Sequence, residues 1–276
     1  MKIALIPPIP NLSLAREGDG IHLLLAHLCK DQRYVDFYKE RSRRGDYIIL
    51  DNSAHEHGTG SPMQGLLKLA KRVGAHEVVV PDVLFSMEET LDSAQDTLDW
   101  LVTVEGWAAY RRAGTPRLML VPQGESLAEL SVCLVGLLQA WCKFVKEAPD
   151  LVPTPVIGIS KDYQVYEGGL QGFVAKTVGP YRGNGIFDVH LLGWANDLWA
   201  TAQIQRSCPW VRSTDSAKPF VYALSKIKLE PGGDYPQYPR RKEDYFIAKI
   251  EDPEVLEIAR ANVQVYRAAA TDTLIL

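Results

Sequence analysis

Short apolar runs alternate with longer stretches of helical periodicity along most of the chain. Seven of these runs have the length and the branched, apolar composition of buried strands. They cover residues 2–6, 47–50, 77–80, 117–121, 155–159, 189–192 and 210–213, and a weaker eighth run covers 221–227. Strands that alternate with helices favour a parallel sheet covered by helices. Seven strands would suit an open sheet, and with the eighth the pattern predicts a compact (β/α)8 TIM-like barrel.

The stretches between the runs show the spacing of amphipathic helices. The first two predicted helices each place four residues on one face, which are His22, Leu25, Ala26 and Cys29 in one and Leu66, Leu67, Ala70 and Val73 in the other. Ser86 followed by Glu89 has the spacing of a capping box and predicts a helix from there to residue 100. Further helices are predicted at 127–145 and 253–269. Residues 229–241 are rich in Pro, Gly and Tyr and predict a surface loop.

Polar residues follow most of the predicted strands at the point where each run ends. In order along the chain these strand-end groups are Asp51-Asn52-Ser53, Asp82, Gln123-Gly124-Glu125, Ser160-Lys161, Gly193 and Asp215. In a (β/α) barrel such positions converge on the carboxyl-end mouth, where active sites of this architecture lie. A single aspartate after a strand is commonly a turn or N-cap residue. The repeated pattern indicates a barrel enzyme without naming its reaction.

Composition and charge narrow the function further. A net charge of −4 and a pI near 5.9 do not announce a nucleic-acid partner, so such contacts must come from local basic patches. The four cysteines are scattered, which argues against a zinc site or another metal site and fits a reducing compartment. No strand is followed by a glycine-rich nucleotide-binding motif. With no signal peptide and no uninterrupted apolar run of membrane-spanning length, the sequence predicts a soluble cytoplasmic protein of one domain, residues 1–276, without a membrane partner.

Six short motifs, in order along the chain, resemble one known family. They are LDNSAHE, VPDV, VPQGE, IGIS, HLLG and VRSTDS. In order and context they resemble the tRNA-guanine transglycosylase superfamily, and within it the compact phage-encoded DpdA-type members, which put 7-deazaguanine bases into DNA. The resemblance runs from about residue 20 to the C-terminus. Each motif is weak alone, and their shared order at strand ends makes the signal specific.

The resemblance implies a role for each matching residue. It makes Asp215 the nucleophile that forms a covalent glycosyl intermediate and Asp51 the residue that transfers the proton. Asp82 and Gln123 match the residues that hydrogen-bond the edge of the base. The remaining residues assigned to base binding are Asn52, Gly124, Gly158, Ile159, Gly193 and His55. His55 stands where the family has a stacking Phe or Tyr, and no cofactor is implied.

The substrate polymer follows from a departure from the family pattern. The Cys/His zinc cluster of the tRNA-modifying members is missing, which favours DNA, with preQ0 or a relative as the incoming base. Expected phosphate contacts are Lys161, Lys218, Arg240 and Arg241. The alternatives are the same exchange on tRNA and a catalytically silent nucleic-acid-binding barrel. A homodimer or a partner protein would help so acidic a chain hold DNA, in the host cytoplasm if the protein is phage-encoded.

Overall fold

Eight strands form one sheet whose order follows the sequence. The computed structural model describes residues 1–161, 172, 174–182, 187–193, 198–230, 245–271 and 273. The strands are β1 (Lys2–Leu5), β2 (Ile21–Leu25), β3 (Tyr47–Asp51), β4 (Glu77–Val79), β5 (Arg117–Leu120), β6 (Val156–Ser160), β7 (Asp188–Leu192) and β8 (Ser213–Ser216). Their order is β1-β8-β7-β6-β5-β4-β3-β2, and the pairs with a defined register are parallel. With helices between the strands, this is the topology of a (β/α)8 barrel, and the predicted fold class is confirmed.

Helices connect the strands. The α-helices of the described residues are α1 (Gln32–Arg43), α2 (Ala54–His57), α3 (Met63–Val73), α4 (Met87–Leu101), α5 (Val104–Arg112), α6 (Leu127–Glu147), α8 (Gly179–Arg182), α9 (Leu198–Ser207), α10 (Lys218–Leu224) and α11 (Pro253–Ala270). Shorter 3₁₀ or π segments are η1 (Ile9–Glu17), η2 (Ala26–Lys30), η4 (Val174–Val178) and η5 (Tyr245–Ile247).

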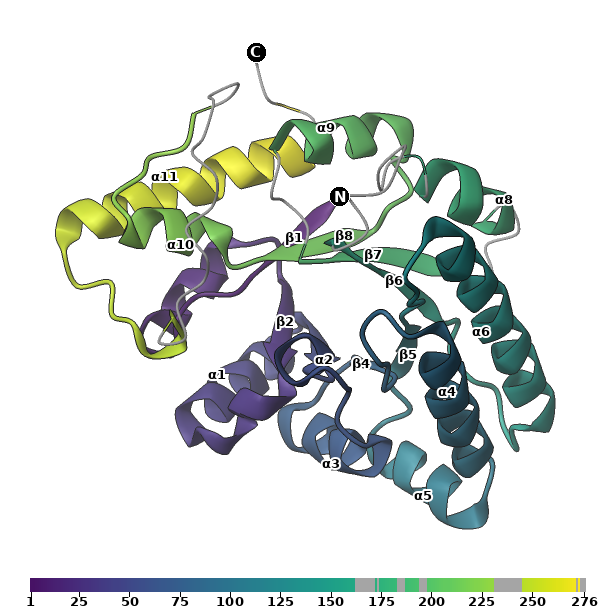
Figure 1. Cartoon of the computed structure of the whole chain (residues 1–276). Helices are drawn as coiled ribbons and strands as arrows, with labels where there is room; N and C mark the ends of the chain where they lie inside the picture. Colours follow the sequence, from purple (N-terminus) through teal and green to yellow (C-terminus); the bar gives the residue numbers. More distant parts are fainter. Residues whose placement is uncertain are drawn as a thin grey trace. The chain divides into compact units, whose positions relative to one another are not determined.

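The chain divides into two compact units. The terminal unit comprises Met1–Leu23 and Leu191–Leu276, and the central unit comprises Leu24–His190. In the terminal unit β1 pairs with β8, and α11 packs against α9 and α10. In the central unit α4 packs against α6, and α3 packs against α1 and α5 (Figure 1). The single domain expected from the sequence stays a prediction.

The predicted helices begin where the sequence supplies a cap. The Ser86 side chain accepts a hydrogen bond from the Glu89 N–H at the start of α4, and Ser126 accepts one from Glu129 at the start of α6. Each cap satisfies one N–H that the helix itself leaves without a partner. The predicted apolar face of α3 is buried. These helices are therefore confirmed with small shifts at their ends.

The predicted helix around His22 and Cys29 is wrong. Residues Ile21–Leu25 form strand β2, all five of them buried, and η2 follows directly. The helix of this region begins only at Gln32, where the Asp31 side chain caps it. A short run that is buried on both faces carries no period of its own, so a strand and a buried helical turn look alike in the sequence.

The eighth strand also lies elsewhere than expected. Residues 221–227 belong mostly to helix α10, which Pro219 helps to start. The last strand is instead β8, displaced by three residues from the predicted 210–213. Its sequence, Ser-Thr-Asp-Ser, has little strand preference, and its pairing with β1 from Lys2↔Ser213 to Leu5↔Ser216 makes it a strand. Most of the predicted loop at 229–241 lies outside the described residues.

Helix α6 is long and apolar enough to cross a membrane by length and composition alone. One face, which includes Leu130, Leu134, Leu137 and Phe144, is buried within the central unit. A core helix of this kind passes the same test of length and composition.

Candidate active site

A buried carboxylate lies just after β4 in the central unit. Asp82 is 4% exposed. Its Oδ1 accepts a hydrogen bond from Asn52 Nδ2 at 2.6 Å, and its Oδ2 accepts one from Gln123 Nε2 at 2.6 Å. Burial raises the pKa of Asp82 from 3.8 to about 6, and the two amide hydrogen bonds oppose that rise. The structure thus brings together three residues that follow three successive strands, β3, β4 and β5.

Both amide side chains are fixed by further contacts. Asn52 Nδ2 also donates to the Val80 carbonyl at 2.8 Å, and Asn52 Oδ1 accepts from the Ala54 N–H at 2.8 Å. Gln123 Oε1 accepts from the Phe85 N–H at 3.2 Å. These partners orient each NH2 group toward Asp82. Asp82, Asn52 and Gln123 therefore form a preorganised hydrogen-bond acceptor site, in which Asn52 holds the carboxylate in place.

Asp51 ends β3 and lies beside a second small network. Its Oδ1 accepts a hydrogen bond from the Ser53 N–H at 2.6 Å. Ser53 has the left-handed backbone conformation, with φ 63°. The Ser53 hydroxyl lies 3.0 Å from His27 Nδ1 and accepts from the His27 backbone N–H at 3.2 Å. His55, which the resemblance placed at the base, is an exposed residue of α2.

The sequence missed His27 and Phe85. His27 is the second residue after β2, so it is a strand-end residue like Asn52 and Asp82, and the wrongly predicted helix concealed it. Phe85 follows β4 with φ 62° and is 45% exposed. Nothing in the sequence near Phe85 signals either property. Its N–H donates to Gln123 Oε1, a contact between residues 38 positions apart.

The glycines predicted to contact the nucleobase differ in the residues that surround them. A Cβ on Gly124 would lie 2.7 Å from Glu129 Cβ and 2.9 Å from Leu130 N. Gly124 therefore has a packing reason, the close approach of α6. Gly158 and Ile159 are buried within β6, and Lys161 directly follows that strand with intermediate exposure.

In the terminal unit Asp215 lies in β8 and is 4% exposed. Its Oδ1 accepts a hydrogen bond from the Gly193 N–H at 2.9 Å. Gly193 follows β7 with φ 66°, a conformation that glycine adopts without strain. Lys218 begins α10, is 8% exposed, and donates its backbone N–H to Ser216 Oγ. Asp215 and Gly193, which the sequence predicted as separate site residues, are thus in direct contact.

The predicted phosphate contacts Arg240 and Arg241 fall outside the described residues. Among the described residues, no three His, Cys, Asp or Glu side chains form a group that could hold a metal ion.

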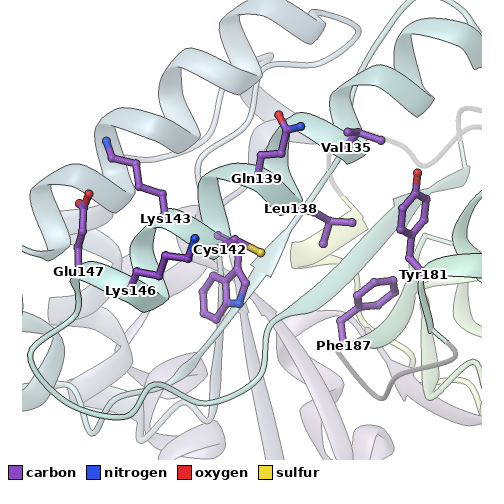
Figure 2. A pocket seen from close by; sticks show the side chains of 10 residues that line it. Val135, Leu138, Gln139, Cys142, Lys143, Lys146, Glu147, Tyr181 and Phe187 are labelled. Atoms are coloured by element: carbon purple, nitrogen blue, oxygen red, sulfur yellow. The ribbon is translucent and has the colours of Figure 1, made fainter.

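A pocket of about 560 Å³ lies along α6 (Figure 2). Its lining consists of Val135, Leu138, Gln139, Trp141, Cys142, Lys143, Lys146, Glu147, Tyr181 and Phe187. The lining is largely apolar, and none of the residues predicted to be functional contributes to it. Lys143 at its edge is engaged by Asp99 at 2.8 Å.

Comparisons with known proteins add little to this geometry. No family model and no curated protein matches the sequence. Among solved structures, the chain is similar to tryptophan synthase from M. tuberculosis in its open form, with a TM-score of 0.48, 13% identity, and coverage of 98% of this chain and 92% of that one. The aminoacrylate-bound form of the same enzyme gives a TM-score of 0.46 and 12% identity, covering 97% of this chain and 91% of that one. At this level of similarity neither structure bears on substrate or reaction.

Proposed function

We propose that this protein is a transglycosylase that replaces guanine in DNA with a 7-deazaguanine base such as preQ0. The observation that carries the proposal is the buried Asp82 carboxylate, held by Asn52 and Gln123. The amino group and ring N–H of a guanine edge are paired donors that need such an acceptor. A site built from buried polar groups rejects bases lacking those donors, because its own groups would be left without partners.

The exchange takes two displacements at the anomeric carbon. Asp215 attacks C1′, the C1′–N9 bond to guanine breaks, and a glycosyl ester forms while the departing base takes up a proton. The incoming base then loses a proton from its ring nitrogen, and that nitrogen displaces the ester and frees Asp215. Asp51 is the residue proposed to deliver the first proton and accept the second. The Gly193 N–H supports the nucleophile role by fixing one oxygen of Asp215.

DNA is the proposed polymer because the sequence lacks the zinc cluster of the tRNA-modifying proteins. Its four cysteines lie at positions 29, 133, 142 and 208, and the structure forms no disulfide from them. A base in a duplex would have to be flipped out, or the substrate would have to be single-stranded. Lys161 and Lys218 are the proposed phosphate contacts among the described residues.

The test is release of labelled guanine from DNA and from tRNA in the presence of excess preQ0. Asp215→Asn keeps the shape of the side chain and removes its ability to form the ester, so it should abolish release. Asp36→Asn, an exposed aspartate of α1, is the matched control and should leave release unchanged. Release from tRNA alone would show that the substrate is tRNA and not DNA. Release from neither polymer, with no covalent adduct to Asp215, would refute the transglycosylase.

A further inference from the structure

His27 and Ser53 are in contact beside Asp51, and the reaction scheme gives neither residue a role. Ser53 is fully buried, and His27 lies in η2, with its side chain 19% exposed. The Ser53 hydroxyl accepts from the His27 backbone N–H at 3.2 Å and lies 3.0 Å from His27 Nδ1. Two atoms of one residue therefore hold the hydroxyl, which fixes the place of Ser53 relative to the end of β2.

The backbone of Ser53 has an unfavourable conformation that places its N–H against the Asp51 carboxylate. With φ 63° and ψ 28° Ser53 occupies the left-handed region, which residues with a side chain avoid. That conformation directs the Ser53 N–H at Asp51 Oδ1, 2.6 Å away. Such conformations persist where surrounding contacts over-determine them. The hydrogen-bond contacts from His27 reach Ser53 from outside its own turn.

The same atoms argue against a hydrolytic triad. A serine–histidine–carboxylate triad needs the serine on one ring nitrogen and the carboxylate on the other. Here Glu56 Oε2 lies 4.0 Å from His27 Nδ1, the nitrogen that also faces Ser53. The nearby His57 ring meets His27 edge-on at 5.5 Å. Because Ser53 is fully buried, its hydroxyl is placed to support neighbouring residues and not to attack a substrate.

We propose that His27 is a positioning residue for Asp51, acting through Ser53. By holding Ser53 in the left-handed conformation, His27 keeps the Ser53 N–H on Asp51 Oδ1. Fixing Oδ1 also sets the direction of Oδ2 and so orients the whole carboxylate for proton transfer. This inference rests on the proposed function, because it gives Asp51 the proton-transfer role.

The experiment is a double-mutant cycle that combines His27→Ala with Ser53→Gly, because glycine adopts the left-handed conformation without strain. His27→Ala should lower kcat of base exchange roughly tenfold to a hundredfold, the scale expected when a reacting group is misplaced. The KM for preQ0 should stay nearly constant, because the Asp82 carboxylate is held by Asn52 and Gln123. Ser53→Gly removes the hydroxyl that His27 holds and should lower kcat less than His27→Ala does, since glycine adopts positive φ without strain. Adding His27→Ala to Ser53→Gly should then cost little more.

Further variants separate this role from simple support of the fold. His27→Asn, which places an amide near the Nδ1 position, should restore part of the lost kcat. His57→Ala removes the neighbouring ring and should leave kcat unchanged. If His27→Ala costs as much in the Ser53→Gly protein as in the wild type, or raises KM as much as it lowers kcat, the positioning role is wrong.

A readout that needs no activity keeps the inference distinct from the proposed function. The Ser53 amide proton donates to a carboxylate, so its resonance should move on His27→Ala. An unmoved resonance would overturn the coupling. Absence of exchange in the wild type, with a moved resonance, would refute the transglycosylase and leave the coupling established.

Discussion

Replacing Asp82 by asparagine should remove a pH dependence that burial gives to the stability of the protein. Asp82 is 4% exposed, and burial raises the pKa of its carboxyl group from 3.8 to about 6. Below the unfolded value of 3.8 the group is protonated in both states. As pH rises, the unfolded chain ionises first while the folded protein keeps its proton, so stability falls until pH passes the folded value.

The size of the effect follows from the two pKa values. Ionised Asp82 costs the folded state roughly 3 kcal/mol at high pH, and between about pH 5 and pH 8 the change is roughly 1.4 kcal/mol. Asparagine has nearly the same shape and no charge. Its NH2 group would face one of the amide donors of Asn52 or Gln123, a cost of roughly 1–3 kcal/mol that does not vary with pH. The two proteins therefore differ in slope as well as in offset.

Urea unfolding of wild type and Asp82→Asn across this pH range measures the difference. The stability of the wild type relative to the variant should fall as pH rises. Asp99→Asn is a control without a slope over this range, because a hydrogen bond from Lys143 lowers the pKa of Asp99 from 3.8. The stability that this carboxylate contributes is fully present above pH 3.8 and is lost only below it. A difference between wild type and Asp82→Asn that is the same at both ends of the range would refute the reasoning.

Three further predictions rest on the same structure. In the proposed function the N–H groups of the base bind ionised Asp82, so the KM for preQ0 should rise as pH falls through about 6, and a flat profile would contradict that role. Gly106→Ala should destabilise the protein by roughly 2 kcal/mol or more, since the added Cβ would lie under 3.0 Å from backbone atoms of α4. Gly65→Ala in α3 should stabilise the protein by about 0.5–1 kcal/mol, because no other atom lies within 4 Å of the added Cβ. Thermal unfolding of the two variants measures both effects. Phe85→Gly should stabilise the protein by roughly 1 kcal/mol by relieving its positive φ, and a lowered melting temperature would show that the exposed ring packs more than it strains.

Much of the fold could be read from the chain because it depends on local pattern. The apolar runs that became β3 to β7 match the structure to within a residue or so at each end. Their strand-end polar groups followed, since parallel strands put their carboxyl ends at one edge of a sheet. The cap at Ser86 is a local hydrogen bond and was predicted from its spacing to Glu89.

The failures occur where the chain carries no period. Strand β2 is buried along its whole length, so its apolar residues do not alternate. Strand β8 is a polar sequence whose strand conformation comes from pairing with β1, more than 200 residues earlier. Misreading β2 also concealed His27, although the rule that found Asp51 and Asp82 applies to it.

The sequence by itself determined the alternation of strands and helices and the polar residues that end the strands. Only the tertiary structure decided what those residues do to one another. The raised pKa of Asp82, the amides that hold it and the left-handed turn at Ser53 depend on contacts between segments about 26 to 41 residues apart. Burial and hydrogen-bond geometry are set when strands assemble, and no local pattern of residues carries them.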